Sequence, residues 1–341
     1  MTGATGFAVP PALEAHEPPE ARGRARDGVR LLVGRRGTGE ISHRAFRDLP
    51  SLLDPGDLLA VNTSATLPAA VRLDRIGVHF STPVPGAGGR VWLVELRDLV
   101  GKSSRPYAGG TPGEWIPLPG GATLTLLGRR TGRLWEARLS TDVVPYLRRH
   151  GTPIRYGHVR RDWPTAAYQT AFARDRSAGS AEMPSAARPF TPALVTRLVA
   201  RGVLFAPLTL HAGVAPPETR EPPHAERYEV PVPTAALVDH VRSRGGRVIA
   251  VGTTVVRALE TSVDAFGRVR ASKGWTDHVV TPEGGVRAVD GLLTGLHEPR
   301  SSHLMIVTAI AGRPLAEAAY RAALDEGYLW HEFGDANLVL P

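Results

Sequence analysis

From Thr191 onward, apolar strands alternate with amphipathic helices, and this order is what most limits the folds open to the chain. Helices are predicted over Pro192–Arg201, Thr234–Ser243 and Thr254–Ala265, and apolar strands over Val203–Leu210 and Arg247–Val251. Elements in this order bury their apolar faces by stacking helices against a sheet. The pattern therefore predicts an α/β fold, with a layered α/β/α main domain.

The first 68 residues and the C-terminal third continue this pattern. Residues 1–25, rich in Pro, Ala and Arg, are expected to form an extended or partly ordered arm. The remaining predicted elements are strands at Leu31–Val33, Glu40–Ser42 and Leu58–Val61, short helices at Ala45–Leu53 and Val143–His150, strand or loop segments at His278–Val280 and Gly291–Leu296, and helices at Leu304–Ala311 and Leu315–Glu326.

Residues 69–140 have a different pattern of apolar and polar residues. Short apolar stretches (AAVRL, RVWLVELR, ATLTLLGRR, LWEARLS) alternate with turns rich in Gly and Pro. Period-two alternation at this spacing is typical of antiparallel strands in a small barrel or curled sheet. We expect an inserted β-barrel domain over 69–140, which divides the α/β domain into 1–68 and 141–341.

Composition excludes several classes of protein. The chain has no cysteine, which rules out disulfides, thiolate metal sites and a cysteine nucleophile. Its N-terminus has no basic region followed by an apolar core, and no apolar run approaches the roughly 20 residues of a membrane span. We therefore expect no membrane association and a cytoplasmic location.

The net charge of +8 has two possible explanations. A basic balance is typical of proteins with a polyanionic partner such as RNA. However, nearly all the basic residues are Arg, and the chain is also rich in Ala, Gly and Pro. A GC-rich coding bias explains that composition without any function.

The segment Val251–Glu260 is the first candidate for a ligand site. Ligands in open α/β sheets gather at the carboxyl ends of strands. Gly252 permits a tight turn after the strand, Thr253 or Thr254 can cap the next helix, and free N–H groups there favour an anion. The alternative is an ordinary capped helix with a surface ion pair between Arg257 and Glu260.

Two histidines lie near other strand ends. His211 directly follows a buried strand and suits proton transfer, although a core histidine bonded to a backbone carbonyl is the alternative. His224 and Glu226 point the same way if their segment is extended. As two ligands without a third they do not make a metal site, and the sequence gives no positive sign of a metal.

Two further loops are rich in polar groups. The loop Leu293–His303 contains Thr294 and His297, and its alternative interpretation is a helix start capped by Ser301 or Ser302. The segment Tyr328–Ala336 mixes aromatic residues with a Gly-Asp turn, so it could close a pocket or pack the C-terminus.

Taken in order, these motifs resemble the S-adenosylmethionine:tRNA ribosyltransferase-isomerase family of queuosine biosynthesis. The resemblance runs from about Arg26 to the C-terminus. The matching pieces are RDGVRLLV, ISHRAFRDLPSLLDPGDLLAVN, the strand-rich insertion, YQTAFA, LTLHAG, PHAERYEV, VGTTVVRALE, TGLHEPRSSHLMIV and FGDANLVL.

The resemblance implies an enzyme in which S-adenosylmethionine is the ribosyl-donating substrate. The family's acceptor is the aminomethyl group of a deazaguanine in a tRNA anticodon; adenine and methionine leave, and epoxyqueuosine forms. A sulfonium acidifies the neighbouring C5′ hydrogens and is a good leaving group, so the site needs mainly a base, a way to protonate adenine, and donors for ribose and carboxylate. The resemblance makes S-adenosylmethionine and tRNA the expected partners, with no metal.

Site residues are carried over from the matching motifs. The candidate bases are His211, His224 and His297, in no order. Thr253, Thr254 and Arg257 are candidates for holding the methionine carboxylate or ribose. The other candidate substrate-binding residues are Asn62, Tyr168, Gln169, Glu226, Gly252, Thr294 and Asp335.

Several loops depart from the family's pattern. The family's Ala-Pro-Thr-Ala-Gly-Leu-His-Phe stretch is replaced within 181–190, where its glycine and histidine are missing, and residues 213–217 are also rewritten. Altered loops on a retained scaffold suggest an altered site. Two alternatives therefore stay open: an enzyme using S-adenosylmethionine on a small-molecule acceptor, and a non-catalytic tRNA-binding paralogue.

Overall fold

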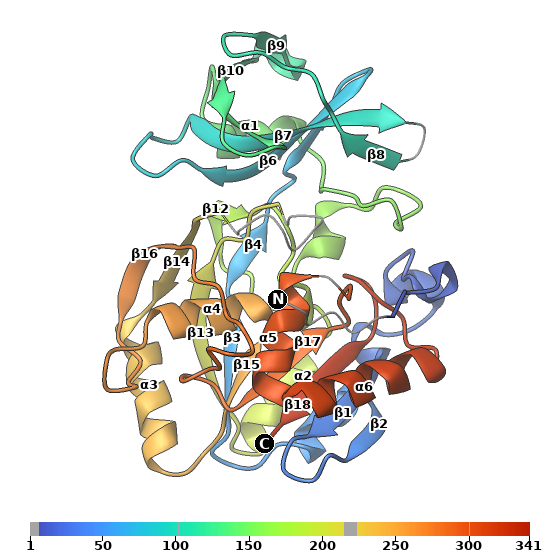
Figure 1. The fold of residues 1–341 in the computed structure, drawn as a ribbon, viewed down its shortest axis with the longest axis vertical. Coiled ribbons are helices and arrows are strands. Elements are labelled where there is room, and N and C mark those ends of the chain that lie inside the picture. The colour runs from blue at the N-terminus through green and yellow to red at the C-terminus, as the bar shows by residue number, and fades with distance from the viewer. Residues whose placement is uncertain (1–6, 101–102, 215–223, 300) are drawn as a thin grey trace.

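A computed structural model describes residues 7–100, 103–214, 224–299 and 301–341. Its larger unit is built on a nine-stranded mixed sheet with the order β16-β14-β13-β3-β15-β17-β18-β1-β2 (Figure 1). The strands are β1 (Arg30–Arg35), β2 (Ile41–Ala45), β3 (Leu58–Asn62), β13 (Leu204–Leu210), β14 (Glu226–Val230), β15 (Val248–Val251), β16 (Ser272–Thr276), β17 (Gly291–Gly295) and β18 (Ala336–Leu340).

The central four strands, β13, β3, β15 and β17, run parallel. Their carboxyl ends therefore meet at one edge of the sheet. In β3, Leu58 and Ala60 belong to one core cluster, whereas Leu59 and Val61 belong to another on the opposite face. Burial on both faces explains why these strands are almost continuously apolar.

Helices cover both faces of the sheet. The first cluster includes side chains of α3 (Val232–Ser243), α4 (Thr253–Thr261), α5 (Ser302–Ala311) and α6 (Arg313–Asp325). The second includes α2 (Pro192–Ala200) and the 3-10 helices η4 (Phe46–Ser51) and η7 (Ser185–Ala187). The predicted α/β class is thereby confirmed.

The second unit is a separate antiparallel sheet (Figure 1, top). Its order is β5-β6-β7-β11-β10-β9, with β8 paired to β7. The strands are β5 (Ala70–Arg72), β6 (Ile76–Pro83), β7 (Val91–Val100), β8 (Ser103–Pro106), β9 (Trp115–Pro117), β10 (Thr123–Arg129) and β11 (Leu134–Leu139). Within the described residues β5 and β9 do not pair, so of the two forms predicted, a small barrel or a curled sheet, the structure shows an open half-barrel.

Helix α1 (Val143–His150) closes the inner face of this half-barrel. Val143, Tyr146 and Leu147 pack in one cluster with Phe80, Trp92 and other inward side chains. The prediction for this helix is confirmed at both ends. A short parallel pair, β4 (Ser64–Thr66) with β12 (Asp175–Ser180), lies between the two large sheets.

The remaining short elements are 3-10 turns. They are η1 (Pro11–Leu13), η2 (Pro19–Arg22), η3 (Arg26–Gly28), η5 (Pro119–Gly121) and η6 (Thr165–Tyr168). The first three belong to the N-terminal arm. From Phe7 on, this arm packs against the C-terminal loop, with the Trp330 N–H donating to the Leu13 carbonyl at 2.8 Å.

Some elements differ from the sequence prediction. The segment predicted as the helix Ala45–Leu53 is the 3-10 turn η4, which contains Pro50. Helix α4 ends at Thr261 and not at Ala265, and the next residue, Ser262, donates its N–H back to the Leu259 carbonyl at 2.9 Å. His278–Val280, predicted as strand or loop, is a loop, and the edge pairing with β14 is made by β16, which ends two residues before His278. Within the described residues, no helix is long and apolar enough to span a membrane.

A buried carboxylate fixes the loop that leads into β17. Glu260, 5% exposed, accepts N–H bonds from Arg287 (2.9 and 3.0 Å) and Ala288 (2.8 Å). We expect Glu260→Ala to lower the free energy of unfolding by about 2–4 kcal/mol, because each buried donor left without an acceptor costs about 1–3 kcal/mol.

Urea unfolding monitored by circular dichroism measures this loss. Glu317→Ala is the matched control, since Glu317 makes only an exposed contact with Arg313 at 3.9 Å. An exposed pair of this kind contributes about 0–1 kcal/mol. Equal losses in the two variants would contradict the role given to Glu260.

Candidate functional site

Asn62 holds together the strand ends where the site is built. It is the last residue of β3 and is fully buried. Its side-chain amide donates to the Leu210 carbonyl (2.9 Å) and to Thr254 Oγ1 (3.2 Å), and its Oδ1 accepts from the N–H groups of Ser64 (3.0 Å) and Leu210 (3.2 Å). One side chain thus fixes the ends of β3 and β13 against the first turn of α4.

The first turn of α4 has no side-chain cap. Gly252 is the N-cap, and its φ of +100° is a conformation that favours glycine. The predicted capping by Thr253 or Thr254 is wrong: the helix starts at Thr253, and the Thr254 hydroxyl accepts a bond from Asn62. The first N–H groups of a helix have no acceptor within it, so this end carries a partial positive charge and available donors.

The rewritten segment 181–190 borders this helix end. A Cβ added to Gly252 would lie 3.4 Å from the Cβ of Ala186, which belongs to η7. The loop in which this chain departs most from the family pattern is therefore next to the α4 terminus.

Arg257 and Glu226 form a buried ion pair beside the same helix end. Their side chains are 13% and 9% exposed. Arg257 also donates to the His278 carbonyl at 3.1 Å, and Glu226 accepts from the Gly213 N–H at 2.7 Å. The surface pair Arg257–Glu260, considered from sequence, is wrong because Glu260 is bound by backbone donors of another loop.

His211 is held by a chain of hydroxyl groups. Its Nδ1 lies 2.7 Å from Ser64 Oγ, and Ser64 Oγ lies 2.8 Å from Ser180 Oγ. The residue is 9% exposed. A ring fixed in this way has a defined orientation, which suits proton transfer at a strand end.

His297 and His303 form a second pair of rings, with centroids 4.7 Å apart. His297 Nε2 lies 2.7 Å from Thr294 Oγ1. Burial and the neighbouring His303 hold the pKa of His297 well below its usual value. Burial and the positive charge of Arg257 lower the pKa of His303 to about 4. Both rings are therefore neutral at pH 7 and able to accept a proton.

His224 lies at the contact between the two sheets. Its Nε2 is 3.0 Å from Ser81 Oγ of β6, and the same hydroxyl accepts from the Val214 N–H at 2.9 Å. Arg133, which precedes β11, donates to the Val214 carbonyl at 3.1 Å. A Cβ at Gly213 would lie 2.1 Å from His224 Nε2 and 2.5 Å from Ser81 Oγ, so a larger residue there would displace these side chains. The remaining rewritten residues, 215–217, lie outside the described residues.

Two of the predicted binding residues bind the protein's own backbone, and a third is buried in an aromatic contact. The Gln169 side chain accepts from the Thr66 N–H (3.0 Å) and donates to the Thr66 carbonyl (2.7 Å). Asp335 accepts the N–H groups of Arg30 and Leu329, each at 2.8 Å. Tyr168 is buried, with its ring 5.1 Å from that of Phe333. These residues shape a neighbouring loop region.

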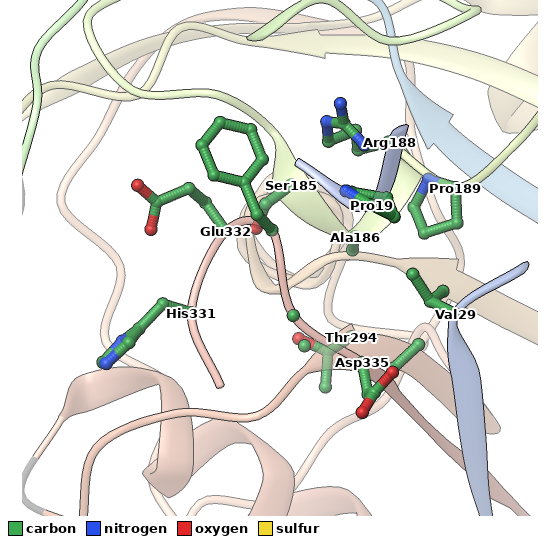
Figure 2. A pocket seen from close by; sticks show the side chains of 14 residues that line it. Pro19, Val29, Ser185, Ala186, Arg188, Pro189, Thr294, His331, Glu332 and Asp335 are labelled. Atoms are coloured by element: carbon green, nitrogen blue, oxygen red, sulfur yellow. The ribbon is translucent and has the colours of Figure 1, made fainter. Parts of the chain in front are cut away.

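A pocket lies in that neighbouring region, between the N-terminal arm, the rewritten segment and the C-terminal loop. Figure 2 shows His331 and Glu332 on one side of it and Arg188 on the other. Thr294 lines it as well, so the pocket adjoins the strand ends. The polar groups of its wall are largely engaged: Arg188 donates to Glu20 and to the Ala167 carbonyl, both at 2.9 Å.

Sequence reasoning missed three kinds of residue. Ser64 and Ser180 were missed because their hydroxyl groups form a hydrogen-bonded chain to His211, which is far from both in the sequence. His303 belongs to a segment interpreted as a helix start, and that interpretation is confirmed by the Ser301 cap on the Leu304 N–H. His331 has a φ of +72° and stacks on His158 at 4.0 Å. Only the polar density of the loops around 300 and 331 could have indicated the two histidines.

No cluster of three or more His, Asp or Glu side chains that could hold a metal ion occurs within the described residues.

The comparisons with known proteins indicate one family. Residues 4–339 match the model of the family described as "Queuosine biosynthesis protein". The chain is 38% identical over 348 residues to the S-adenosylmethionine:tRNA ribosyltransferase-isomerase of Symbiobacterium thermophilum, covering 98% of each chain. It is 36% identical to the protein of that name from Gloeobacter violaceus, covering 100% of this chain and 96% of that protein.

A solved structure is similar as well. The S-adenosylmethionine tRNA ribosyltransferase of Thermotoga maritima matches with a TM-score of 0.55 and 30% identity. The match covers 98% of this chain and 99% of that chain.

The neutral His303 ring predicts a loss of stability in mild acid. Its pKa is about 4 in the folded state, below the usual value of 6.5, so the unfolded chain binds more protons between these two pH values. The free energy of unfolding therefore falls as the pH drops from about 6.5 towards about 4. Below about pH 4 this group lowers it no further. We expect His303→Gln to lose less stability between pH 7 and pH 5 than the parent chain.

Urea unfolding at the two pH values tests this expectation. His240→Gln, at an exposed position of α3, removes a histidine outside the site and is the control. An equal pH dependence in the parent and in His303→Gln would show that the ring is not kept neutral by the fold.

Proposed function

The chain belongs to the S-adenosylmethionine:tRNA ribosyltransferase-isomerase family of queuosine biosynthesis, and we propose that it catalyses the reaction for which that family is named. In this reaction S-adenosylmethionine donates its ribosyl unit to a deazaguanine base in tRNA. Epoxyqueuosine forms, and adenine and methionine are released.

The observation that carries the assignment of the site is the buried Arg257–Glu226 pair beside the uncapped start of α4. Buried ion pairs are expensive to desolvate and are weak evidence for stability alone. An anchored guanidinium next to free helix N–H groups is well suited to a carboxylate. We assign the methionine carboxylate, or the ribose hydroxyls, to Thr253, Thr254 and Arg257.

The histidines around this point supply the proton transfers. A general base must be unprotonated at the working pH and within reach of the proton that it removes. His297 meets the first condition because its pKa is well below the usual value. His211 is oriented by Ser64, and His224 lies at the half-barrel contact. We keep all three as candidate bases, with His303 as an additional neutral group.

The other predicted residues have supporting roles in this proposal. Asn62 and Gly252 fix the start of α4, Glu226 anchors Arg257, and Thr294 orients His297. Gln169 and Asp335 hold the neighbouring loops in place through backbone contacts, and Tyr168 does so by packing against Phe333. No metal is required, because the sulfonium is already an activated leaving group.

The wider assignments follow the same proposal. We assign residues 69–140 to an inserted β-barrel-like domain and residues 1–68 and 141–341 to the α/β main domain. The partners are S-adenosylmethionine and tRNA, and the place of action is the cytoplasm, where tRNA is modified.

The direct test is to incubate the protein with S-adenosylmethionine, with and without tRNA carrying the deazaguanine base, and to follow adenine and methionine by mass spectrometry. We expect both products only when the tRNA is present. Release without RNA would favour a small-molecule acceptor. Binding of tRNA without release would identify a non-catalytic paralogue, and either result would contradict the proposal.

Arg257 gives a residue-level test. We expect the double variant Arg257→Gln/Glu226→Gln to lower kcat/KM by about 30- to 160-fold, since losing a charged contact costs about 2–3 kcal/mol and each 1.36 kcal/mol is tenfold in rate. Changing both partners leaves no lone buried charge, so the fold should persist.

The control is Arg197→Gln, which removes a charge from the exposed side of α2. Thermal unfolding of both variants separates a damaged site from a damaged fold. Full turnover by the folded double variant would remove Arg257 from the site.

A further inference from the structure

The positive charge of this chain is concentrated in one region. Residues 69–162 contain 15 Lys and Arg against 7 Asp and Glu, a net charge of +8. The rest of the chain contains 26 of each kind, so its net charge is zero. The half-barrel and the segment that follows it thus account for the whole surplus of the protein. A uniform compositional bias towards Arg does not explain so uneven a distribution.

The acidic residues of this region are mostly engaged. Asp142 pairs with Arg90 (3.1 Å), and Asp98 pairs with Arg105 (2.9 Å). Asp162 contacts two arginines, Arg72 and Arg155, and Glu95 contacts Arg97 and Arg133. These contacts leave few carboxylates to neutralise the other arginines.

Six arginines of the region remain exposed. Within the described residues, none of them makes a side-chain hydrogen bond or an ion pair. They are Arg75, Arg130, Arg138, Arg148, Arg149 and Arg160. They come from strand ends and turns of the half-barrel, from the last turn of α1 and from the segment after it. Charges spread in this way suit an extended polyanion better than a compact acidic ligand.

An exposed tryptophan lies on the same sheet. Trp115 in β9 is 66% exposed. It pairs with Thr125 of β10, and Thr125 pairs with Arg138 of β11. Residues directly opposite each other on paired strands face the same side of a sheet. One face therefore presents a solvent-exposed ring and, about 10 Å away across two strand spacings, a free guanidinium. Aromatic rings beside cationic groups are the usual elements of single-stranded nucleic-acid binding.

The half-barrel also contacts the candidate catalytic region. Ser81 of β6 bonds His224 and Val214, and Arg133 bonds the Val214 carbonyl. Figure 1 shows this sheet lying across the edge where the parallel strands of the main sheet end. A nucleic acid bound to the half-barrel is thus close to the strand-end site.

We propose that the outer face of the half-barrel, with the turns at its edges, forms the tRNA-binding surface, with its exposed arginines on phosphates and Trp115 stacked on an unpaired base. The identity of the RNA rests on the proposed function; the surface itself rests on charge and geometry. Because the loop of a tRNA anticodon is single-stranded, its bases are available for such stacking.

Binding of fluorescently labelled tRNA by the full chain, followed by anisotropy at several salt concentrations, tests the surface. We expect the triple variant Arg75→Ala/Arg130→Ala/Arg138→Ala to bind at least tenfold more weakly. The slope of log K against log salt should fall by about 2–3, since each phosphate contact contributes about 0.7–0.9. Trp115→Ala should weaken binding about fivefold or more with the slope unchanged.

The matched control is Arg197→Ala/Arg201→Ala/Arg244→Ala, which removes the same charge from exposed positions of the main unit. It should bind within about twofold of the parent, with the parent's salt slope. Equal weakening by both triple variants would show that only net charge matters, and no weakening by the half-barrel variant would place the RNA elsewhere. Either result, or no binding by the parent chain, overturns the proposal.

Adenine release separates this proposal from the proposed function. If the parent binds tRNA through the half-barrel but releases no adenine, the proposed binding surface is supported and the proposed function is contradicted. If the half-barrel triple variant turns over with an unchanged KM for tRNA, the proposed function is supported and the proposed binding surface is contradicted. The KM for S-adenosylmethionine should be the same in parent and variant.

Discussion

The buried amide of Asn62 is the contact on which the site depends. It satisfies backbone groups at the ends of β3 and β13 and binds the Thr254 hydroxyl in the first turn of α4. Because Thr254 is engaged in this way and Gly252 has no side chain, the helix starts without a cap. Three neighbouring elements are thus held in register while the donors of the helix start stay available to a ligand.

The charges around that helix start depend on one another. Arg257 is buried with Glu226 as its partner, and Glu226 is held in turn by the Gly213 N–H. The same arginine helps to keep the His303 ring neutral. A cation and neutral bases can therefore coexist in a small volume, which is the combination needed to hold a carboxylate and move a proton. The hydroxyls of Ser64 and Ser81 extend this arrangement to His211 and His224, the latter at the half-barrel.

Local pattern was enough to predict much of the fold. The strands β3, β13 and β15 and the helices α1 and α2 have continuous or periodic apolar runs, and their positions were predicted to within two residues. The strands β16 and β18 were missed because their stability comes from partners distant in sequence, such as β14 for β16. The half-barrel was recognised by its alternation, but closure depends on whether the first and last strands meet, which alternation does not determine.

The site was predicted less completely, for the same reason. The strand-end positions of His211 and Gly252 follow from topology. The partner of Arg257 does not, since the nearby Glu260 serves another loop and the true partner comes from β14. Gln169 and Asp335 match motifs of the family, yet their side chains bind backbone groups. A motif gives residue identity, whereas the distinction between contacting a substrate and holding a loop requires the hydrogen bonds themselves.

The central claim is that the ligand binds where the parallel strands end, at the start of α4. A crystal structure of the chain with S-adenosylmethionine and a tRNA anticodon stem-loop locates the nucleoside directly. The account predicts the methionine carboxylate within hydrogen-bonding distance of Arg257 and the first turn of α4, with the ribose facing His297 or His303. A nucleoside bound instead in the pocket between Arg188 and His331, with the strand ends unoccupied, would contradict it.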